Sequence, residues 1–351
     1  MSERDDEAGP LEPPPPRATT VLHGHADAER ALLDAYRGGR LPHAWLIGGP
    51  AGIGKATLAY RMARFVLAHG DPRAAQVQAA TSLQVEADHP VARRIAAQAH
   101  GDLLLLERTI NEKTGKLRQD IQVDDVRRTV TFFGSTAGEG GWRLAIVDAV
   151  DELNREGANA LLKVLEEPPR RALLLLVSHS AARVLPTIRS RCRLLALRPL
   201  AAEDVARAAA AAIGKRPDVA EITAAAAVAE GSVRRALALL DGDALDLRNR
   251  IVALLERLPA VDPRALHALG DRLYGTDPAT LAAFVDAVNA WLSARLSIPL
   301  AAGAKDSGRL VRVAEAWEKV NHAAREVETY NLERKPLVFN VFGWLAEPSR
   351  G

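Results

Sequence analysis

Residues 49–57 read Gly-Pro-Ala-Gly-Ile-Gly-Lys-Ala-Thr, and this stretch decides the fold. It follows a short apolar run at 44–47 and leads into a helical pattern of apolar residues over 57–67. A strand, a glycine-rich loop and a helix in this order form a phosphate-binding loop. The loop N–H groups and the positive end of the helix dipole attract phosphate oxygens. We therefore predict a nucleotide site that contains Gly49, Gly52, Gly54, Lys55 and Thr57.

Two positions of this site lack groups that nucleotide hydrolysis needs. A hydroxyl normally follows the lysine and holds Mg²⁺, but Ala56 stands there, and Thr57 lies about 100° further round the helix. The apolar run 144–147 ends at Asp148, which is available to a metal-bound water. Ala149 follows, where a hydrolytic glutamate is expected. The pattern predicts that ATP or ADP, with Mg²⁺, binds here and that hydrolysis is absent or weak.

Two more acids lie just beyond this strand end. Asp151 and Glu152 could orient an attacking water in place of the missing glutamate. The alternative, which we favour, is that both are solvated loop acids.

The rest of the first half alternates strands with helices. Four further apolar runs are bounded by polar residues or turns, at 103–106, 144–147, 173–177 and 194–197. Runs of this length predict strands, and the run at 103–106 reads as a strand that is buried on both faces. Helical patterns separate the strands, so we expect an α/β fold with a parallel sheet covered on both sides.

Composition changes divide the chain into four parts. Residues 1–20 hold four consecutive prolines and predict a disordered tail. Residues 21–198 hold the strands and form the predicted nucleotide-binding domain. An alanine-rich helical stretch at 199–245 predicts a small lid domain, and a longer helical pattern at 246–346 predicts an all-helical C-terminal domain.

The composition excludes several classes of protein. Forty-six basic and 44 acidic side chains nearly cancel, so no polybasic surface is expected. Cys192 is the single cysteine, which excludes an internal disulfide framework and a multi-cysteine zinc site. We expect Cys192 to be an inert, small core residue. No stretch reaches the roughly 20 apolar residues of a membrane helix. We predict a cytoplasmic protein without membrane contact.

Several segments together resemble one family, the clamp-loader branch of the AAA+ proteins. The resemblance covers about residues 20–245. The segments that carry it are Leu41–Leu46, Arg143–Ala149, Asn159–Pro169, Ser190-Arg191-Cys192 and Gly231–Leu237. It implies a P-loop AAA+ parallel-sheet domain, then the helical lid, and then a C-terminal collar domain over 246–346. Many members carry a four-cysteine zinc module, but the matching region at 70–101 has no cysteine, so zinc is not expected.

The resemblance also assigns roles to two arginines. Arg191, in the Ser-Arg-Cys motif, is implied to be an arginine finger that acts in trans on nucleotide bound by a neighbouring subunit. Arg234 matches a lid arginine that senses bound nucleotide, although a helix-surface charge is an equal alternative. The arginines around Arg191 could instead face DNA phosphates or a partner. His179 ends the fourth strand at a sensor position, and we do not expect it to be a catalytic base.

The expected function is that of a clamp-loader subunit of a bacterial replicative DNA polymerase, with little ATPase activity of its own. The resemblance implies a hetero-oligomer with clamp-loader ATPase subunits and a delta-type subunit. Its further partners would be the sliding clamp and primer-template DNA. The first alternative is a self-sufficient clamp-loader motor ATPase. The second is a nucleotide-binding regulatory module outside replication.

Overall fold

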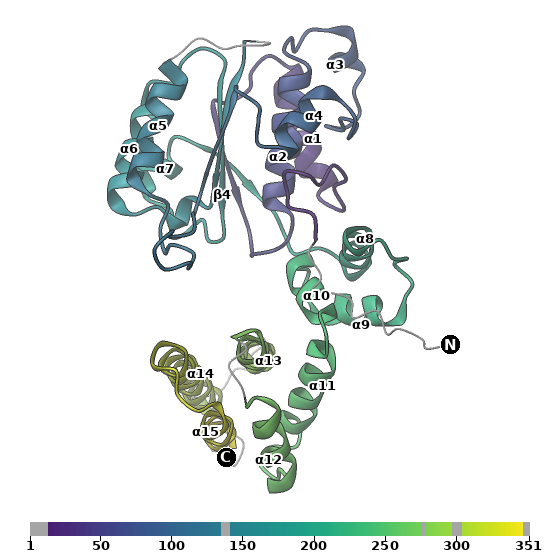
Figure 1. The fold of residues 1–351 in the computed structure, drawn as a ribbon, viewed down its shortest axis with the longest axis vertical. Coiled ribbons are helices and arrows are strands. Elements are labelled where there is room, and N and C mark those ends of the chain that lie inside the picture. Colours follow the sequence, from purple (N-terminus) through teal and green to yellow (C-terminus); the bar gives the residue numbers. More distant parts are fainter. Residues whose placement is uncertain (1–12, 135–140, 275–277, 297–303, 347–351) are drawn as a thin grey trace. The chain divides into compact units, whose positions relative to one another are not determined.

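The structure, a computed structural model, describes residues 13–134, 141–274, 278–296 and 304–346 (Figure 1). It divides the chain into two units, Met1–Ala238 and Leu239–Gly351. The first unit holds the predicted nucleotide-binding domain and most of the predicted lid. Whether the lid is a domain of its own stays a prediction.

The first unit is built on a parallel sheet. Among the described residues the sheet has five strands in the order β2-β3-β4-β1-β5. Their bounds are Ala44–Gly48 for β1, Leu103–Glu107 for β2, Arg143–Asp148 for β3, Ala172–Ser178 for β4 and Arg193–Ala196 for β5. Each predicted strand is confirmed to within two residues at either end. The expected α/β fold class is also confirmed.

The expectation that β2 is buried on both faces is wrong. Only Leu106 of this strand is fully buried, while Leu103, Leu104 and Leu105 are half-buried. The physical reason is that β2 lies at one edge of the sheet, where the neighbouring strand covers one side only. The central strands β1 and β4 are buried at every residue.

Helices cover both faces of the sheet (Figure 1). One face packs against α1 (Ala26–Arg37), α2 (Lys55–Ala68), α3 (Ala75–Ala79) and α4 (Pro90–Ala96). The other face packs against α5 (Val123–Gly134), α6 (Arg155–Glu166) and α7 (Pro186–Arg189). Side chains alternate along β3, so that Leu144 and Ile146 join the first core while Ala145 and Val147 join the second.

The predicted lid region is helical. It contains α8 (Ala202–Ile213), α9 (Ala220–Val228) and α10 (Val233–Leu240). Small side chains let α8 and α9 approach closely, with Ala209, Ala225 and Ala226 buried between them and their neighbours. Gly231, at φ 77°, lies against the backbone of Leu200, where a Cβ atom would meet the Leu200 nitrogen at 2.5 Å.

The second unit is all-helical in its described residues. Its helices are α11 (Ala244–Leu255), α12 (Pro263–Arg272), α13 (Pro278–Leu296), α14 (Ala304–Tyr330) and α15 (Arg334–Ala346). They share one core in which Phe284, Val320 and Val341 are fully buried. Residues 275–277 and 297–303 of the predicted collar domain lie outside the described residues. The collar role stays a prediction.

The last residues of the predicted N-terminal tail have contacts in the structure. Residues 1–12 lie outside the described residues, but residues 13–20 have defined contacts with the first unit. The guanidinium of Arg64 donates to the carbonyl oxygens of Pro16, Arg17 and Thr19. Proline-rich backbone keeps its carbonyl acceptors even though it cannot form a helix. Whether residues 1–20 form a disordered tail stays a prediction. None of the described helices is long and apolar enough to cross a membrane.

Candidate nucleotide-binding site

Lys55 lies where the predicted phosphate loop becomes helix α2. Gly54 adopts φ 98°, which glycine reaches without strain, and Lys55 follows as the first helical residue. The side chain is buried, and Nζ donates hydrogen bonds to the carbonyl oxygens of Gly49, at 2.7 Å, and Pro50. Burial lowers the pKa of Lys55 to about 8, although nearby carboxylates act in the opposite direction. The ammonium is thus held inside the loop.

Two acids end neighbouring strands beside Lys55. Asp148 ends β3, Glu107 ends β2, and the two residues are register partners in the sheet. Burial raises the pKa of both carboxyl groups, and the charge of Asp148 raises that of Glu107 further. His179, Lys55 and Arg234 oppose the shift in the pKa of Asp148, whereas Glu152 adds to it. A carboxylate pair of this kind attracts cations, and Lys55 and Arg234 act on Asp148 from the loop and from α10.

Helix α10 is attached directly to the phosphate loop. The N–H groups of Val233 and Arg234 donate to the carbonyl oxygen of Gly52, at 2.9 and 3.4 Å. Gly52 has φ 76°, and a Cβ atom there would meet the Cβ of Arg234 at 2.6 Å and the Oγ of Ser232 even closer. Glycine is therefore required for this approach, and the approach brings Arg234 to the site.

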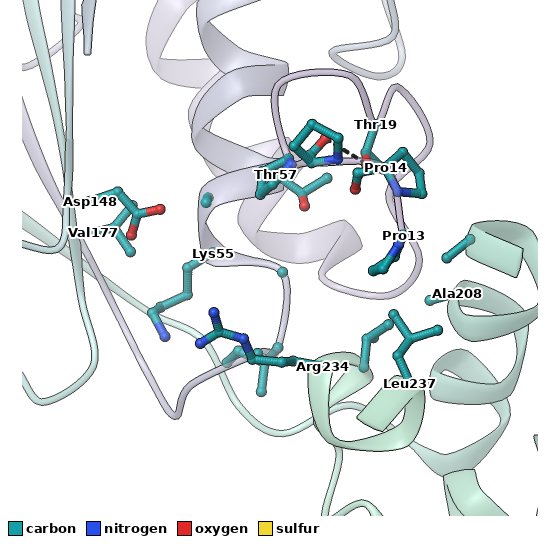
Figure 2. A pocket seen from close by; sticks show the side chains of 18 of the residues that line it. Pro13, Pro14, Thr19, Lys55, Thr57, Asp148, Val177, Ala208, Arg234 and Leu237 are labelled. Carbon is teal, nitrogen blue, oxygen red and sulfur yellow. Dashed lines mark hydrogen bonds between the residues drawn. The ribbon is translucent and has the colours of Figure 1, made fainter. Parts of the chain in front are cut away.

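These residues surround a cavity of about 750 Å³ (Figure 2). Its polar side chains include Lys55, Asp148 and Arg234, which the sequence predicted together. Its other end is apolar. The lining there consists of Pro13 to Pro16, Val21, Leu22, Ala208, Ala211, Ala212 and Leu237. A phosphate-bearing molecule with an apolar ring system matches this division of polar and apolar surface.

The lining of the cavity contains the two alanines that the sequence analysis singled out. Ala56 and Ala149 both contribute to it, and neither offers an oxygen for a metal ion or a water. Thr57 also lines the cavity. In Figure 2, Thr57 is drawn on the side of the N-terminal residues and Asp148 on the other side of Lys55. The Thr57 hydroxyl is therefore a poor replacement for one at position 56.

Asp151 and Glu152 have structural partners. Both oxygens of the Asp151 carboxylate accept from the N–H of His179, at 3.1 Å, and one accepts from the N–H of Ser180. Glu152 forms an ion pair with Arg108 at 2.7 Å. The two acids are therefore not freely solvated, because both carboxylates are bound within the chain. They fix the loops after β3, β4 and β2.

Arg191 lies two residues beyond the end of the short helix α7. Its guanidinium forms an ion pair with Glu166 of α6 at 2.8 Å and donates to the carbonyl oxygen of Thr187 at 2.9 Å. The side chain keeps 36% of its surface exposed. Arg191 is not among the described residues that line the cavity of its own chain. The neighbouring Cys192 packs against the α5–α6 side of the core, and burial raises the pKa of its thiol to about 12.

Two parts of the site were not predicted from the sequence. Glu107 was overlooked, although the carboxyl ends of parallel strands are where ligands of α/β proteins bind, and that rule could have found it. The N-terminal residues 13–23 were missed because a proline-rich composition carries no signal for where a chain packs.

The residues present suit a nucleotide. Loop amides, Lys55 and the apolar end match phosphates and a base, and a Mg²⁺ ion that accompanies a nucleotide takes most of its ligands from phosphates and water. Asp148 is the side chain that would hold this ion. Among the described residues, no three His, Cys, Asp or Glu side chains gather closely enough to hold a metal ion by themselves.

Comparisons with known proteins decide the family. Residues 24–201, more than half of the chain, match the family model described as DNA polymerase III, delta subunit. The DNA polymerase III subunit delta' of Pseudomonas aeruginosa is 40% identical over 157 residues, which are 44% of this chain and 43% of that protein. The chain belongs to the delta-prime family. The expectation of a delta-prime subunit, which rests on the degraded site beside an intact Ser-Arg-Cys motif, is thereby confirmed.

A second delta-prime relative supports the same family. The DNA polymerase III subunit delta' of Escherichia coli is 30% identical over 235 residues, which are 66% of this chain and 64% of that protein. The chain thus spans about half to two thirds of the length of these delta-prime relatives. A solved DNA polymerase III gamma subunit-related protein from Thermotoga maritima has a TM-score of 0.43 at 16% identity, over 90% of this chain and 99% of that one.

Proposed function

We propose that this chain is a clamp-loader subunit that supplies Arg191 to the ATPase site of a neighbouring subunit and hydrolyses little or no ATP itself. In the assembled loader, ATP bound by neighbours drives loading of the sliding clamp onto primed DNA. The partners are the ATPase subunits, a delta-type subunit, the clamp and the primer-template junction. Membership of the delta-prime family supports this assignment.

The observation that carries the proposal is the separation of Arg191 from its own cavity. Lys55, Asp148 and Arg234 line that cavity, whereas Arg191 is half-exposed elsewhere and is oriented by Glu166 and the Thr187 carbonyl. A guanidinium has five N–H donors, so these two contacts and a third to Oγ of Ser190, at 3.4 Å, leave others for a phosphate. Neutralising charge on a γ phosphate in this way contributes about 10³- to 10⁵-fold to phosphoryl transfer.

The chain's own pocket supports the second half of the proposal. Nucleotide binding needs the loop amides and Lys55, which are present. Hydrolysis also needs a placed metal and an oriented water. Ala56 and Ala149 supply neither, and Asp151 and Glu152, the two acids that follow Ala149 most closely in the sequence, already bind other groups.

The test uses the assembled clamp-loader complex. Arg191→Ala should leave assembly intact and lower DNA-stimulated ATP turnover at least about tenfold. Arg189→Ala, at a neighbouring exposed arginine of α7, is the matched control and should leave turnover unchanged. Wild-type turnover in the Arg191→Ala complex would remove the trans-acting role.

A motor ATPase is the second candidate, because the glycines and Lys55 of the loop are intact. Purified chain alone decides between the two. Steady turnover above about 0.1 per second would favour a motor and contradict the role given to Ala56 and Ala149. Turnover that is equally low in the wild type and in Lys55→Ala supports the proposal.

A further inference from the structure

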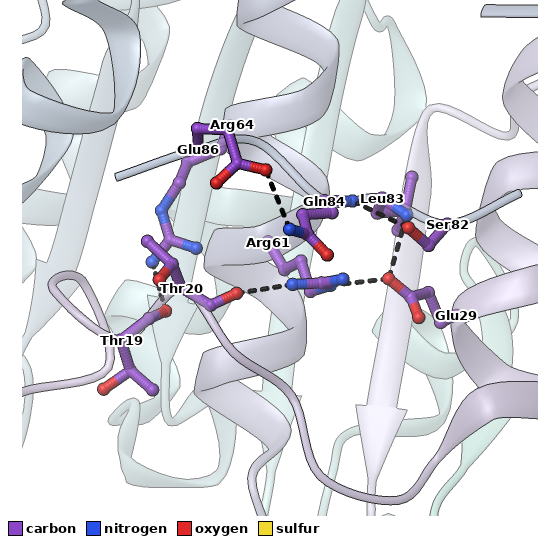
Figure 3. Close-up of polar contacts among 9 residues, drawn as sticks. All are labelled: Thr19, Thr20, Glu29, Arg61, Arg64, Ser82, Leu83, Gln84 and Glu86. Carbon is purple, nitrogen blue, oxygen red and sulfur yellow. Dashed lines mark hydrogen bonds and ion pairs between the residues drawn. The ribbon is translucent and has the colours of Figure 1, made fainter. Parts of the chain in front are cut away.

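Two arginines of helix α2 are buried beside the N-terminal residues. Arg61 is 6% exposed and Arg64 is 1% exposed. Both lie on the helix that begins at Lys55, between about two and three turns further along. Figure 3 shows that their guanidinium groups point at the chain that precedes α1. Neither arginine lines the cavity.

Their contacts are mainly with main-chain carbonyl groups. Nη2 of Arg64 lies 3.2, 3.1 and 2.6 Å from the carbonyl oxygens of Pro16, Arg17 and Thr19. Nη1 of Arg61 donates to the carbonyl oxygen of Thr20. The two arginines thus hold four of five consecutive residues by their backbone.

A second nitrogen of the Arg61 guanidinium binds a side chain within the first unit. Its Nε donates to Oε1 of Glu29 at 2.5 Å, and the same oxygen accepts from the N–H of Leu83 at 2.9 Å (Figure 3). Helices α1 and α2, the loop at Leu83 and the N-terminal residues therefore meet at one buried ion pair. The N-terminal residues are attached to a rigid frame.

This arrangement has an energetic cost that packing alone does not explain. A buried charge costs free energy unless it is paired and fully hydrogen-bonded. Burial lowers the pKa of Arg64, helped by the charge of Arg61, to about 10, and within the described residues its Nε has no hydrogen-bond partner. A leucine or methionine would fill the space of a core residue more favourably. The arginine is better explained by the carbonyl groups that it holds.

The residues so held form a wall of the nucleotide cavity. Pro13 to Pro16, Ala18 to Thr20 and Val21 to His23 all line it. In Figure 2, Pro13 and Pro14 are drawn opposite Lys55, near Ala208 and Leu237 of the lid helices. Lys55 and the loop amides take the phosphate end, so this apolar end is where a base would lie.

We propose that Arg61 and Arg64 are positioning residues for nucleotide binding, which fix the backbone of residues 16–20 so that the N-terminal chain closes the base end of the pocket. The inference rests on the proposed nucleotide site and extends it to side chains that do not contact the ligand. Preorganising this wall spares the ligand the cost of ordering it. The preorganised wall should therefore strengthen binding of the base and not of the phosphates.

The test measures binding of ADP and of inorganic tripolyphosphate to the isolated full-length chain by titration calorimetry. Arg64→Lys keeps the charge, but the lysine side chain is one bond shorter, so its Nζ falls short of the position from which Nη2 contacts the three carbonyl oxygens. It should weaken ADP binding about tenfold while tripolyphosphate binding changes less than about twofold. Lys55→Ala should weaken both ligands. Arg30→Lys, at an exposed arginine of α1, is the matched control and should weaken neither.

A double-mutant cycle tests whether Arg64→Lys weakens ADP binding only because it destabilises the fold. Deleting residues 2–20 should reproduce the selective loss of ADP affinity, and Arg64→Lys should add nothing further in the shortened chain. Equal losses for ADP and tripolyphosphate, or a loss from Arg64→Lys that persists in the shortened chain, would overturn the inference. A wild type that binds no ADP would also overturn it. None of these three results would bear on Arg191, whose role is tested by the ATP turnover of the assembled complex.

Discussion

At the scale of single residues, Lys55 gives the pocket a pH dependence. Phosphate binding needs the charged ammonium, and burial lowers the pKa of Lys55 to about 8 against the influence of Asp148 and Asp151, while Arg234 lowers it too. The charged form dominates below pH 7 and is lost as the pH rises through 8. ADP affinity should fall about tenfold between pH 7 and 9.

Lys55→Arg is the control for this titration, because a guanidinium stays charged over the same range. Calorimetry at pH 7, 8 and 9 measures the affinity of both proteins. A wild-type affinity that does not change with pH, or a Lys55→Arg affinity that falls in parallel, would contradict the assignment to Lys55.

Glu166 should help to orient Arg191, the proposed arginine finger. Its ion pair with Arg191 is 2.8 Å long and exposed, and pairs of this kind contribute about 0.2–1 kcal/mol. Glu166→Gln should therefore lower ATP turnover of the assembled complex by about two- to fivefold, much less than Arg191→Ala. Glu167→Gln changes an adjacent exposed acid and is the matched control. Identical rates for the two glutamine variants would show that the pair does not orient Arg191.

At the scale of elements, the contact between α10 and the phosphate loop depends on Gly52. Gly52→Ala places a methyl group against Ser232 and Arg234 at a positive φ. We expect a loss of about 1–3 kcal/mol in the free energy of unfolding and a large loss of ADP affinity. Gly39→Ala separates the two causes, because Gly39 has φ 65° but open space around it.

Denaturant titration measures the free energy of unfolding of both glycine variants. Gly39→Ala reports the cost of backbone strain alone, so its effect on stability should be smaller and its ADP affinity should be that of the wild type. If both variants lose the same stability and keep ADP affinity, the close approach of α10 does not matter.

The same scale shows why strands were easier to predict than their surroundings. An apolar run such as Leu173–Val177 is stable in one arrangement, as a strand buried between two helical layers. The burial of Leu103–Leu106 was predicted wrongly because four leucines do not specify whether their strand is central or at an edge. That position depends on the order in which strands pair, which is set by contacts between segments distant in the sequence.

At the scale of the whole molecule, the described cores of the two units share no residues. Phe284 is fully buried in the core of the second unit, and Phe284→Ala should destabilise that unit by about 3–5 kcal/mol. Calorimetric unfolding should show two transitions, with only one shifted, and ADP affinity should stay at the wild-type value. Phe133→Ala is the reciprocal control in the first unit. A single transition that shifts in both variants would contradict independent units.

The sequence by itself determined the phosphate loop, the five strands, the helical second half and the two alanines at 56 and 149. These features are local, because they follow from the type and spacing of nearby residues. Only the tertiary structure decided that Glu107 pairs with Asp148, that Asp151 holds the backbone at His179, and that Arg191 lies beside Glu166. The same holds for residues 16–20, whose backbone is hydrogen-bonded to arginines more than 40 positions away. Contacts between distant segments leave no periodic pattern in the sequence. The chemical role of such residues can therefore be inferred only when the folded structure shows which partners they contact.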